Sequence, residues 1–139
     1  MESIAGLRVP ACLDSLAGIR AFVRTTGARL GADPEQLTEL VLAVDEAATN
    51  IVMHGDCEGT EIIAVAMARD GDHLVVQLTD EARPFDPTAT AAPGLTDAPW
   101  ERVGGLGVLL MRRLTDGMTY RRLPDGGNEL TLVKVCPEV

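Results

Sequence analysis

The sequence predicts one α+β domain, a two-layer sandwich with helices packed on one face of a mixed, mainly antiparallel sheet. Strand-like segments at 60–80 and 118–135 each contain a turn signal and so predict two hairpins. Segments with helical spacing of apolar residues precede each hairpin. Helices between antiparallel hairpins bury their apolar stripes as a layer on the sheet. A chain of 139 residues without repeat or linker is expected to form a single domain, residues 1–139.

The N-terminal segment predicts a strand followed by a helix. Residues 3–9 form the expected strand, which ends at Pro10. A helix is expected from Asp14, with Leu16, Ile19 and Val23 on one side and its end near Gly27 or Gly31.

The stretch "GADPEQL" predicts the start of a second, longer helix. Asp33 is the expected N-cap and Pro34 the first helical residue, while Gln36 completes a capping box. Gly55 is the expected stop. Between these ends, one apolar stripe holds Leu37, Leu40, Val41, Val44, Ala48 and Ile51.

The second half predicts a hairpin, a long loop, a helix and a second hairpin. Asp70-Gly71 is the signal for the first turn. Four prolines exclude a regular helix or central strand over residues 81–103, and a loop of this length in a compact domain is often functional. The run "VGGLGVLLMRR" then opens a helix, and "PDGG" joins the last two strands.

Composition and charge narrow the classes of function. The formal net charge of −9 argues against a nucleic-acid or anionic-membrane surface. No stretch of 18 apolar residues and no signal peptide is present, so a cytoplasmic protein without membrane contact is expected. The cysteines Cys12, Cys57 and Cys136 are odd in number and lack CxxC spacing, which predicts reduced thiols and no zinc site.

The stretch "VDEAATNIVMHG" aligns Glu46, Asn50 and His54 at intervals of one helical turn. A solvated face and a capping role for His54 are one interpretation. Small and apolar neighbours such as Ala43 favour a covered face instead. In that case Glu46 is a suitable base and Asn50 offers an oxygen ligand that Mg²⁺ accepts.

Two further stretches carry candidate ligand contacts. Asp80 ends the strand "HLVVQLTD", where its carboxylate either starts a turn or accepts a hydrogen bond from an exocyclic amine such as that of adenine. Gly104, Gly105 and Gly107 open a helix, where free backbone amides either form a plain loop or cradle phosphates. Neither a P-loop nor a Rossmann fingerprint is present.

Taken in order, these segments resemble the GHKL, or Bergerat-type, ATP-binding domain, above all that of the bacterial anti-sigma-factor serine/threonine kinases. "LAVDEAATNIVMHG" resembles the N-box of that family, "LTDEARPFDP" its adenine-binding segment and "GGLGVLLMRRLTDGMTY" its glycine turn with the following helix. The opening "LRVPACLDSLAGIRAFV" and the closing "GGNELTLVK" are similar too, so the resemblance spans nearly the whole chain.

The resemblance implies ATP and Mg²⁺ as cofactors and assigns a role to each candidate residue. Glu46 would be the general base, Asn50 the Mg²⁺ ligand and Asp80 the partner of the adenine amine. Gly105 and Gly107, with Gly104 beside them, would let an ATP lid at about 85–104 approach the phosphates.

The family pattern is not complete in this chain. Ala82 replaces the first glycine after the adenine-binding aspartate, Arg83-Pro84 replaces a more flexible pair, and Val103 replaces an earlier lid glycine. Since the last box is only "GGNEL", Thr131 receives no role. Weaker ATP binding than is typical of the family is therefore expected.

The implied function is a protein kinase that sequesters a sigma factor and phosphorylates a serine on an anti-sigma-factor antagonist. No direct nucleic-acid contact is expected, and a homodimer is left open. The alternative is a regulatory binding module of the same fold, with nucleotide as a structural ligand or absent; Ala82 and Val103 favour it, whereas Glu46 and Asn50 favour the kinase. A histidine kinase is the weakest interpretation, because no segment remains for a phosphoacceptor helical hairpin.

Overall fold

A computed structural model describes residues 3–54, 61–82, 84, 86–89, 103–124 and 126–137. Its helices are α1 (Leu16–Arg29), α2 (Pro34–His54) and α3 (Val103–Leu114), with short 3₁₀ helices η1 (Leu13–Ser15) and η2 (Pro87–Ala89). Its strands are β1 (Ser3–Pro10), β2 (Ile62–Asp70), β3 (His73–Asp80), β4 (Gly117–Arg122) and β5 (Asn128–Val135).

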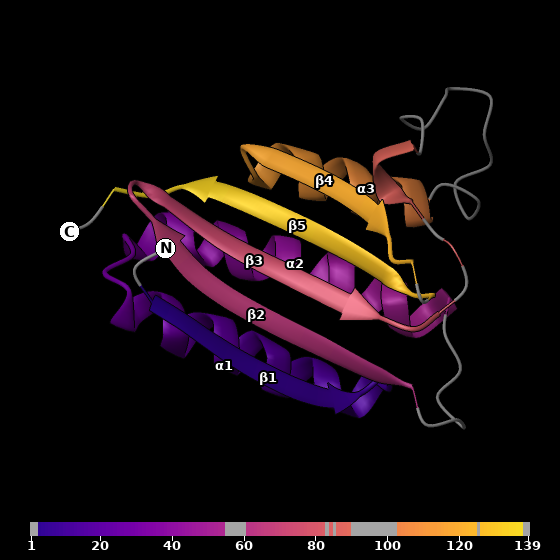
Figure 1. Cartoon of the computed structure of the whole chain (residues 1–139). Coiled ribbons are helices and arrows are strands. Elements are labelled where there is room, and N and C mark those ends of the chain that lie inside the picture. The colour runs from indigo at the N-terminus through magenta and orange to yellow at the C-terminus, as the bar shows by residue number, and fades with distance from the viewer. Residues whose placement is uncertain are drawn as a thin grey trace.

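The predicted two-layer α+β sandwich is confirmed. The five strands form one sheet in the order β1-β2-β3-β5-β4, and every neighbouring pair is antiparallel, so the described strands include no parallel pair. The three α-helices lie together on one face, behind the sheet in Figure 1. The predicted order of elements along the chain is also confirmed.

The end of the first helix and the start of the second are those that the sequence predicts, and the start of the first differs; Gly55, the predicted stop of the second helix, lies outside the described residues. A turn of 3₁₀ helix precedes α1, which begins at Leu16 instead of Asp14. Gly31 adopts a φ of 79° after the last turn of α1, so that the helix ends in the left-handed conformation that favours glycine. At the start of α2, Asp33 Oδ2 accepts the Gln36 backbone N–H at 3.3 Å, which is the predicted N-cap.

Both hairpins turn at glycines. Asp70 pairs with His73, so the first turn consists of Gly71 and Asp72, one residue later than the predicted Asp70-Gly71. Gly71 has a φ of 60° there, as a tight hairpin turn requires. Gly126 and Gly127 have φ values of 93° and 111° before β5, where a residue with a side chain would be strained.

The core lies between the helices and one face of the sheet. The predicted stripe of α2 is buried except for the partly buried Ile51. Among the described arginines, only Arg69 is buried, with 1% of the residue exposed. It donates to three carbonyl oxygens, at 2.6 Å to Leu30, 3.0 Å to Gly71 and 2.9 Å to Cys136. The end of α1 is thereby joined to the first hairpin and to the end of β5.

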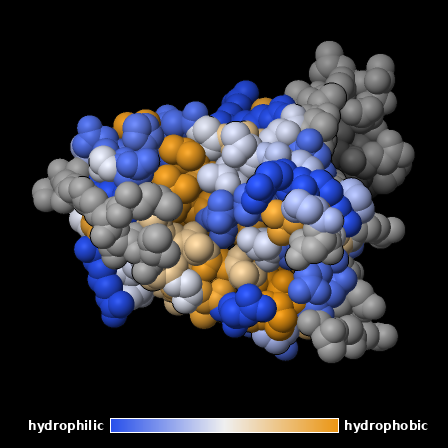
Figure 2. All heavy atoms as spheres, viewed as in Figure 1, coloured by the Kyte–Doolittle hydropathy of each residue, from blue (hydrophilic) through white to orange (hydrophobic). Residues whose placement is uncertain are grey.

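The opposite face of the sheet is turned toward the viewer in Figures 1 and 2. A shallow groove there is lined by small and polar residues, among them Gly6, Arg8, Ala64, Ala66, Gln77 and Thr79. Within the described part of the chain, none of the helices combines the length and the apolar character needed to cross a membrane.

The prediction of three reduced thiols is wrong for Cys12, which is disulfide-bonded. Cys57 lies outside the described residues. The fold explains why the spacing of the cysteines gave no sign of this. Ala11 donates its N–H to the Glu61 carbonyl at 3.1 Å, so the chain after β1 lies beside the chain that leads into β2. Cys136 is free, as predicted, and its side chain is buried.

Candidate functional site

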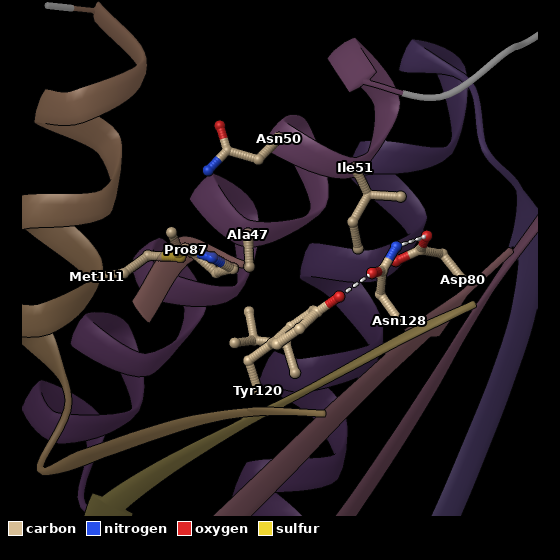
Figure 3. A pocket seen from close by; sticks show the side chains of 9 residues that line it. Ala47, Asn50, Ile51, Asp80, Pro87, Met111, Tyr120 and Asn128 are labelled. Atoms are coloured by element: carbon tan, nitrogen blue, oxygen red, sulfur yellow. Dashed lines mark hydrogen bonds between the residues drawn. The ribbon is translucent and has the colours of Figure 1, made fainter. Parts of the chain in front are cut away.

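A pocket lies where the end of β3 meets α2 and α3 (Figure 3). About 290 Å³ of space lies between its walls, and this figure includes space that is open to solvent. The lining residues come from α2 (Ala47, Asn50, Ile51), from the sheet (Asp80, Tyr120, Asn128, Leu130), from η2 (Pro87) and from α3 (Met111). Most of these are apolar, so the few polar groups decide what can bind.

Among the described residues that line this pocket, Asp80 supplies the only carboxylate, and 5% of the residue is exposed. Its Oδ1 accepts the Ala82 backbone N–H at 2.8 Å and Asn128 Nδ2 at 3.0 Å. No described residue donates to its Oδ2. Since a carboxylate accepts but does not donate, Oδ2 selects a ligand group that carries a hydrogen.

Ala82, one of the departures from the family pattern, takes part in the same network. Besides its N–H bond to Asp80, its carbonyl oxygen accepts Arg122 Nη1 at 2.9 Å and Asn128 Nδ2 at 3.2 Å. No described residue other than glycine has a positive φ, so Ala82 does not need the backbone freedom of the glycine it replaces. The residue is buried with its backbone polar groups satisfied.

Asn50 lies on α2 across the pocket from the sheet (Figure 3). Its Nδ2 is buried and has no hydrogen-bond partner among the described residues, which is costly unless a ligand supplies one. Half a turn about its terminal torsion exchanges the amide nitrogen and oxygen, and would present an oxygen instead. Asn50 therefore fits a polar ligand, or a metal ion that accepts an amide oxygen.

Glu46 lies one turn before Asn50 on α2 and faces α3. A Cβ atom placed on Gly107 would lie 2.8 Å from Glu46 Oε2, so the missing side chain of Gly107 leaves room for this carboxylate. The sequence led us to expect Gly107 at the approach of the lid to the phosphates. In the structure it lies within α3, because this helix already begins at Val103.

Gly104 and Gly105 fall in the first turn of α3. The first backbone N–H groups of a helix have no partner within it, and they favour anions. Asn50 and Asp80 thus line one pocket, and the Glu46–Gly107 contact lies one turn of α2 away from Asn50. Most of the predicted lid, residues 90–102 with Trp100, lies outside the described residues.

The part of the pocket wall that η2 forms is held in place by the side chain of Arg112. Arg112 of α3 donates to the carbonyl oxygens of Pro87, at 3.4 Å, and of Thr88. Asp86 Oδ1 also accepts the Thr88 N–H at 2.8 Å and so caps η2. These bonds hold η2, and with it Pro87, against α3 beside the edge strand β4.

Sequence reasoning missed Asn128 and Tyr120 as site residues. One signal could have identified Asn128: it shares the period of two of Leu130 and Leu132, which predicts that its side chain points inward. Tyr120 has no comparable signal of its own, because its place in the pocket depends on the pairing of β4 with β5.

Among the described residues, no three His, Cys, Asp or Glu side chains are gathered as a cluster that could hold a metal ion. This does not conflict with a Mg²⁺ ion held by one protein oxygen, because Mg²⁺ commonly keeps several waters and binds substrate phosphates.

The sequence is similar to those of known ATPase-domain and kinase proteins. The model of the "Histidine kinase-like ATPase domain" family matches residues 9–134. The anti-sigma F factor of Bacillus subtilis is 31% identical over 129 residues, which cover 86% of each chain. Serine-protein kinase RsbW of Staphylococcus epidermidis is 26% identical over 135 residues, or 92% of this chain and 84% of that protein.

Two solved structures share the fold. The RsbU and RsbW domains of Rv1364c from Mycobacterium tuberculosis match with a TM-score of 0.66 and 21% identity, over 95% of this chain and 32% of that one. The SiaB-SiaC complex from Pseudomonas aeruginosa matches with a TM-score of 0.66 and 20% identity, over 93% of this chain and 88% of that one.

Proposed function

The chain belongs to the family of histidine kinase-like ATPase domains, and we propose that it is an ATP-dependent serine/threonine protein kinase of the anti-sigma-factor type. In this role it sequesters a sigma factor and phosphorylates a serine on an antagonist of the anti-sigma factor. The observation that carries the proposal is a pocket lined by both Asp80 and Asn50. Among the described residues, none donates to Asp80 Oδ2 and none is a partner of the Asn50 amide nitrogen.

Asp80 is proposed to recognise the base of the nucleotide. Its Oδ2 would accept a hydrogen bond from the exocyclic amine of adenine, while the apolar walls of the pocket take the ring. Guanine carries a carbonyl oxygen in place of that amine, and two acceptors repel each other. The pocket is therefore expected to prefer adenine over guanine.

The phosphates are proposed to lie between Asn50 and the start of α3. The N–H groups of Gly104 and Gly105, in the first turn of α3, would be available to an anion because glycine carries no side chain that could block it. Asn50 would supply an amide oxygen to Mg²⁺ after a half turn of its amide, whose nitrogen has no partner among the described residues. When bound, Mg²⁺ neutralises charge on the phosphoryl group that is transferred.

Glu46 is proposed to accept the proton of the attacking serine hydroxyl. It lies on α2 one turn from Asn50, and so close to the proposed phosphate site. Gly107 leaves its carboxylate room beside α3. A positioned base of this kind contributes about 10²–10⁴-fold to a rate.

Calorimetry with ATP, ADP and GTP, with and without Mg²⁺, tests the nucleotide site. We expect binding of both adenine nucleotides, stronger binding of ATP with Mg²⁺, and weak or no binding of GTP. Asp80→Asn should weaken ADP binding more than Glu46→Gln does, because only Asp80 touches the base. The absence of heat with either adenine nucleotide at millimolar concentration would refute the site.

Phosphate transfer tests the kinase. The antagonist is identified as the protein that co-purifies with the chain from its native cell and receives label from γ-labelled ATP. Glu46→Gln should slow this labelling about 10²–10⁴-fold while ADP affinity stays nearly constant. A Glu46→Gln variant as fast as the parent would show that the base is misassigned. Nucleotide binding without any transfer would leave the regulatory binding module as the function.

A further inference from the structure

We propose that Asn128 is a positioning residue for adenine selectivity, which holds Asp80 so that Oδ2 faces the pocket, and that Tyr120 and Arg122 hold Asn128 in turn. The proposal rests on the proposed nucleotide site and assigns it residues outside the N-box and glycine turn. Figure 3 shows Tyr120, Asn128 and Asp80 joined in one chain of hydrogen bonds at the edge of the pocket.

Strand pairing brings these side chains together. Asp80 lies opposite Asn128 in the β3–β5 pair, and Asn128 lies opposite Arg122 in the β4–β5 pair. The three residues form a row across three strands where the apolar core ends. Gly127 makes the approach possible, because a Cβ atom there would lie 2.5 Å from the Asp80 carbonyl oxygen.

The amide of Asn128 uses its full hydrogen-bonding capacity. Its two amide hydrogens go to Asp80 Oδ1, at 3.0 Å, and to the Ala82 carbonyl, at 3.2 Å. Its oxygen accepts Arg122 Nη1 at 3.4 Å and the hydroxyl of Tyr120. A reversed amide would place its oxygen against Asp80 Oδ1, so that two acceptors would face each other. The four partners therefore fix a single orientation.

This orientation decides which oxygen of Asp80 remains for a ligand. The terminal torsion of an aspartate is soft, so its two oxygens can exchange places at little cost. Oδ1 is held by two donors, and one of them is the Asn128 amide. Without that amide the carboxylate can turn away from the pocket, and the energy of its bond to an exocyclic amine is lost in part.

If Asn128 is a positioning residue, its removal should lower the affinity for some ligands and not for others. If Asn128 acts through Asp80, its removal weakens the binding of ADP but does not change the binding of an analogue without the 6-amino group. If Asn128 only supports the fold, both ligands weaken together. The comparison of these two ligands separates the two roles in the same protein sample.

The experiment measures the Kd of ADP and of purine riboside diphosphate, which carries hydrogen at position 6, for the parent, Asn128→Leu and Tyr120→Phe. We expect Asn128→Leu to weaken ADP about 10- to 100-fold, as for a lost hydrogen bond to a charged group, and to change the analogue less than about twofold. Tyr120→Phe, which keeps the ring in the pocket, should show the same preference with a smaller loss.

Thr131→Val is the matched control. This residue also lies in β5, and its hydroxyl accepts Gln77 Nε2 at 3.4 Å on the face of the sheet away from the helices. It should leave both affinities unchanged. Thermal unfolding of each variant checks the fold, and Tyr120→Phe carries the test if Asn128→Leu does not fold.

Equal losses for the two ligands, or an unchanged ADP affinity in both variants, would overturn the proposal. A parent protein that binds neither ligand would refute the nucleotide site itself, and the role of Asn128 with it. A parent that binds ADP no better than the analogue would keep the site but would refute the reading of the amine by Asp80.

Discussion

Replacement of Gly107 by alanine is expected to slow phosphate transfer without weakening nucleotide binding. The added Cβ atom would lie 2.8 Å from Glu46 Oε2, whereas ordinary contact begins at 3.4 Å, so the carboxylate must retreat by about 0.6 Å. The end of a flexible glutamate can make this movement at little energetic cost. Its new position, however, is no longer the one that the native structure provides for a base.

The size of the effect follows from geometry. A misplacement of about 1 Å in a catalytic group can cost about 10²-fold in rate, so we expect a loss of roughly 10- to 100-fold. Stability should change by less than about 1 kcal/mol, because alanine favours a helix over glycine by about that amount and offsets the cost of moving Glu46. Rate and stability are thus expected to separate.

The assay compares initial rates of labelling of the antagonist from γ-labelled ATP, together with the Kd of ADP. Gly18→Ala is the matched control: it is the same substitution on α1, where an added Cβ atom meets nothing within 4 Å. It should stabilise the protein slightly and leave the rate unchanged. The pair Gly107→Ala and Glu46→Gln completes a double-mutant cycle.

The double-mutant cycle tests whether Gly107 affects the rate through the Glu46 carboxylate. If Gly107 acts through the carboxylate, Gly107→Ala slows the parent but adds no loss in the Glu46→Gln background. A full additional loss in that background would show that Gly107 acts by another route. A parallel fall in ADP affinity would favour the role inferred from the sequence, in which this glycine lies at the approach to the phosphates.

Three other substitutions test separate parts of the structure. Asn50→Ala should lower ATP affinity and transfer rate together and abolish the effect of Mg²⁺ on ATP binding, as calorimetry would show; an unchanged Mg²⁺ effect would exclude Asn50 as the metal ligand. Arg112→Ala should weaken ADP binding several-fold because it releases Pro87. Arg113 is an exposed neighbour, and Arg113→Ala should leave ADP binding unchanged. Equal Kd values for the two variants would argue against this support of the pocket wall. Arg69→Met should lower the free energy of unfolding in urea by roughly 2–4 kcal/mol, because it leaves carbonyl groups without their donor, and a loss below about 1 kcal/mol would contradict that account.

The fold could be predicted from the sequence because its signals are local. The Asp33 cap involves a partner three residues away, and Gly71 adopts the backbone conformation that its hairpin requires. These features depend on neighbouring residues and the chirality of the backbone. The one-residue shift of the first turn arose because alternation alone does not fix which residues of "RDGDH" pair, whereas the register with the rest of the sheet does.

The site could be predicted only in part, because its contacts join distant segments. Asp80 and Asn128 are 48 residues apart, and only the pairing of β3 with β5 makes them neighbours. The same holds for Glu46 and Gly107, which meet where α2 packs on α3. The disulfide of Cys12 was missed for a related reason, since the chains beside β1 and β2 meet only in the folded protein.

Two departures from the family pattern, Ala82 and Val103, favoured a binding module over a kinase while only the sequence was considered. The structure weakens that argument. Ala82 has no positive φ and still donates its N–H to Asp80, so the backbone there performs its part without glycine. Val103 is the first residue of α3, a helical position that a residue with a side chain can occupy. Neither residue therefore distinguishes the two functions, and the distinction depends on whether Glu46 reaches a serine hydroxyl. Glu46→Gln is thus the deciding variant: a kinase loses transfer and keeps nucleotide, whereas a binding module shows no transfer to lose.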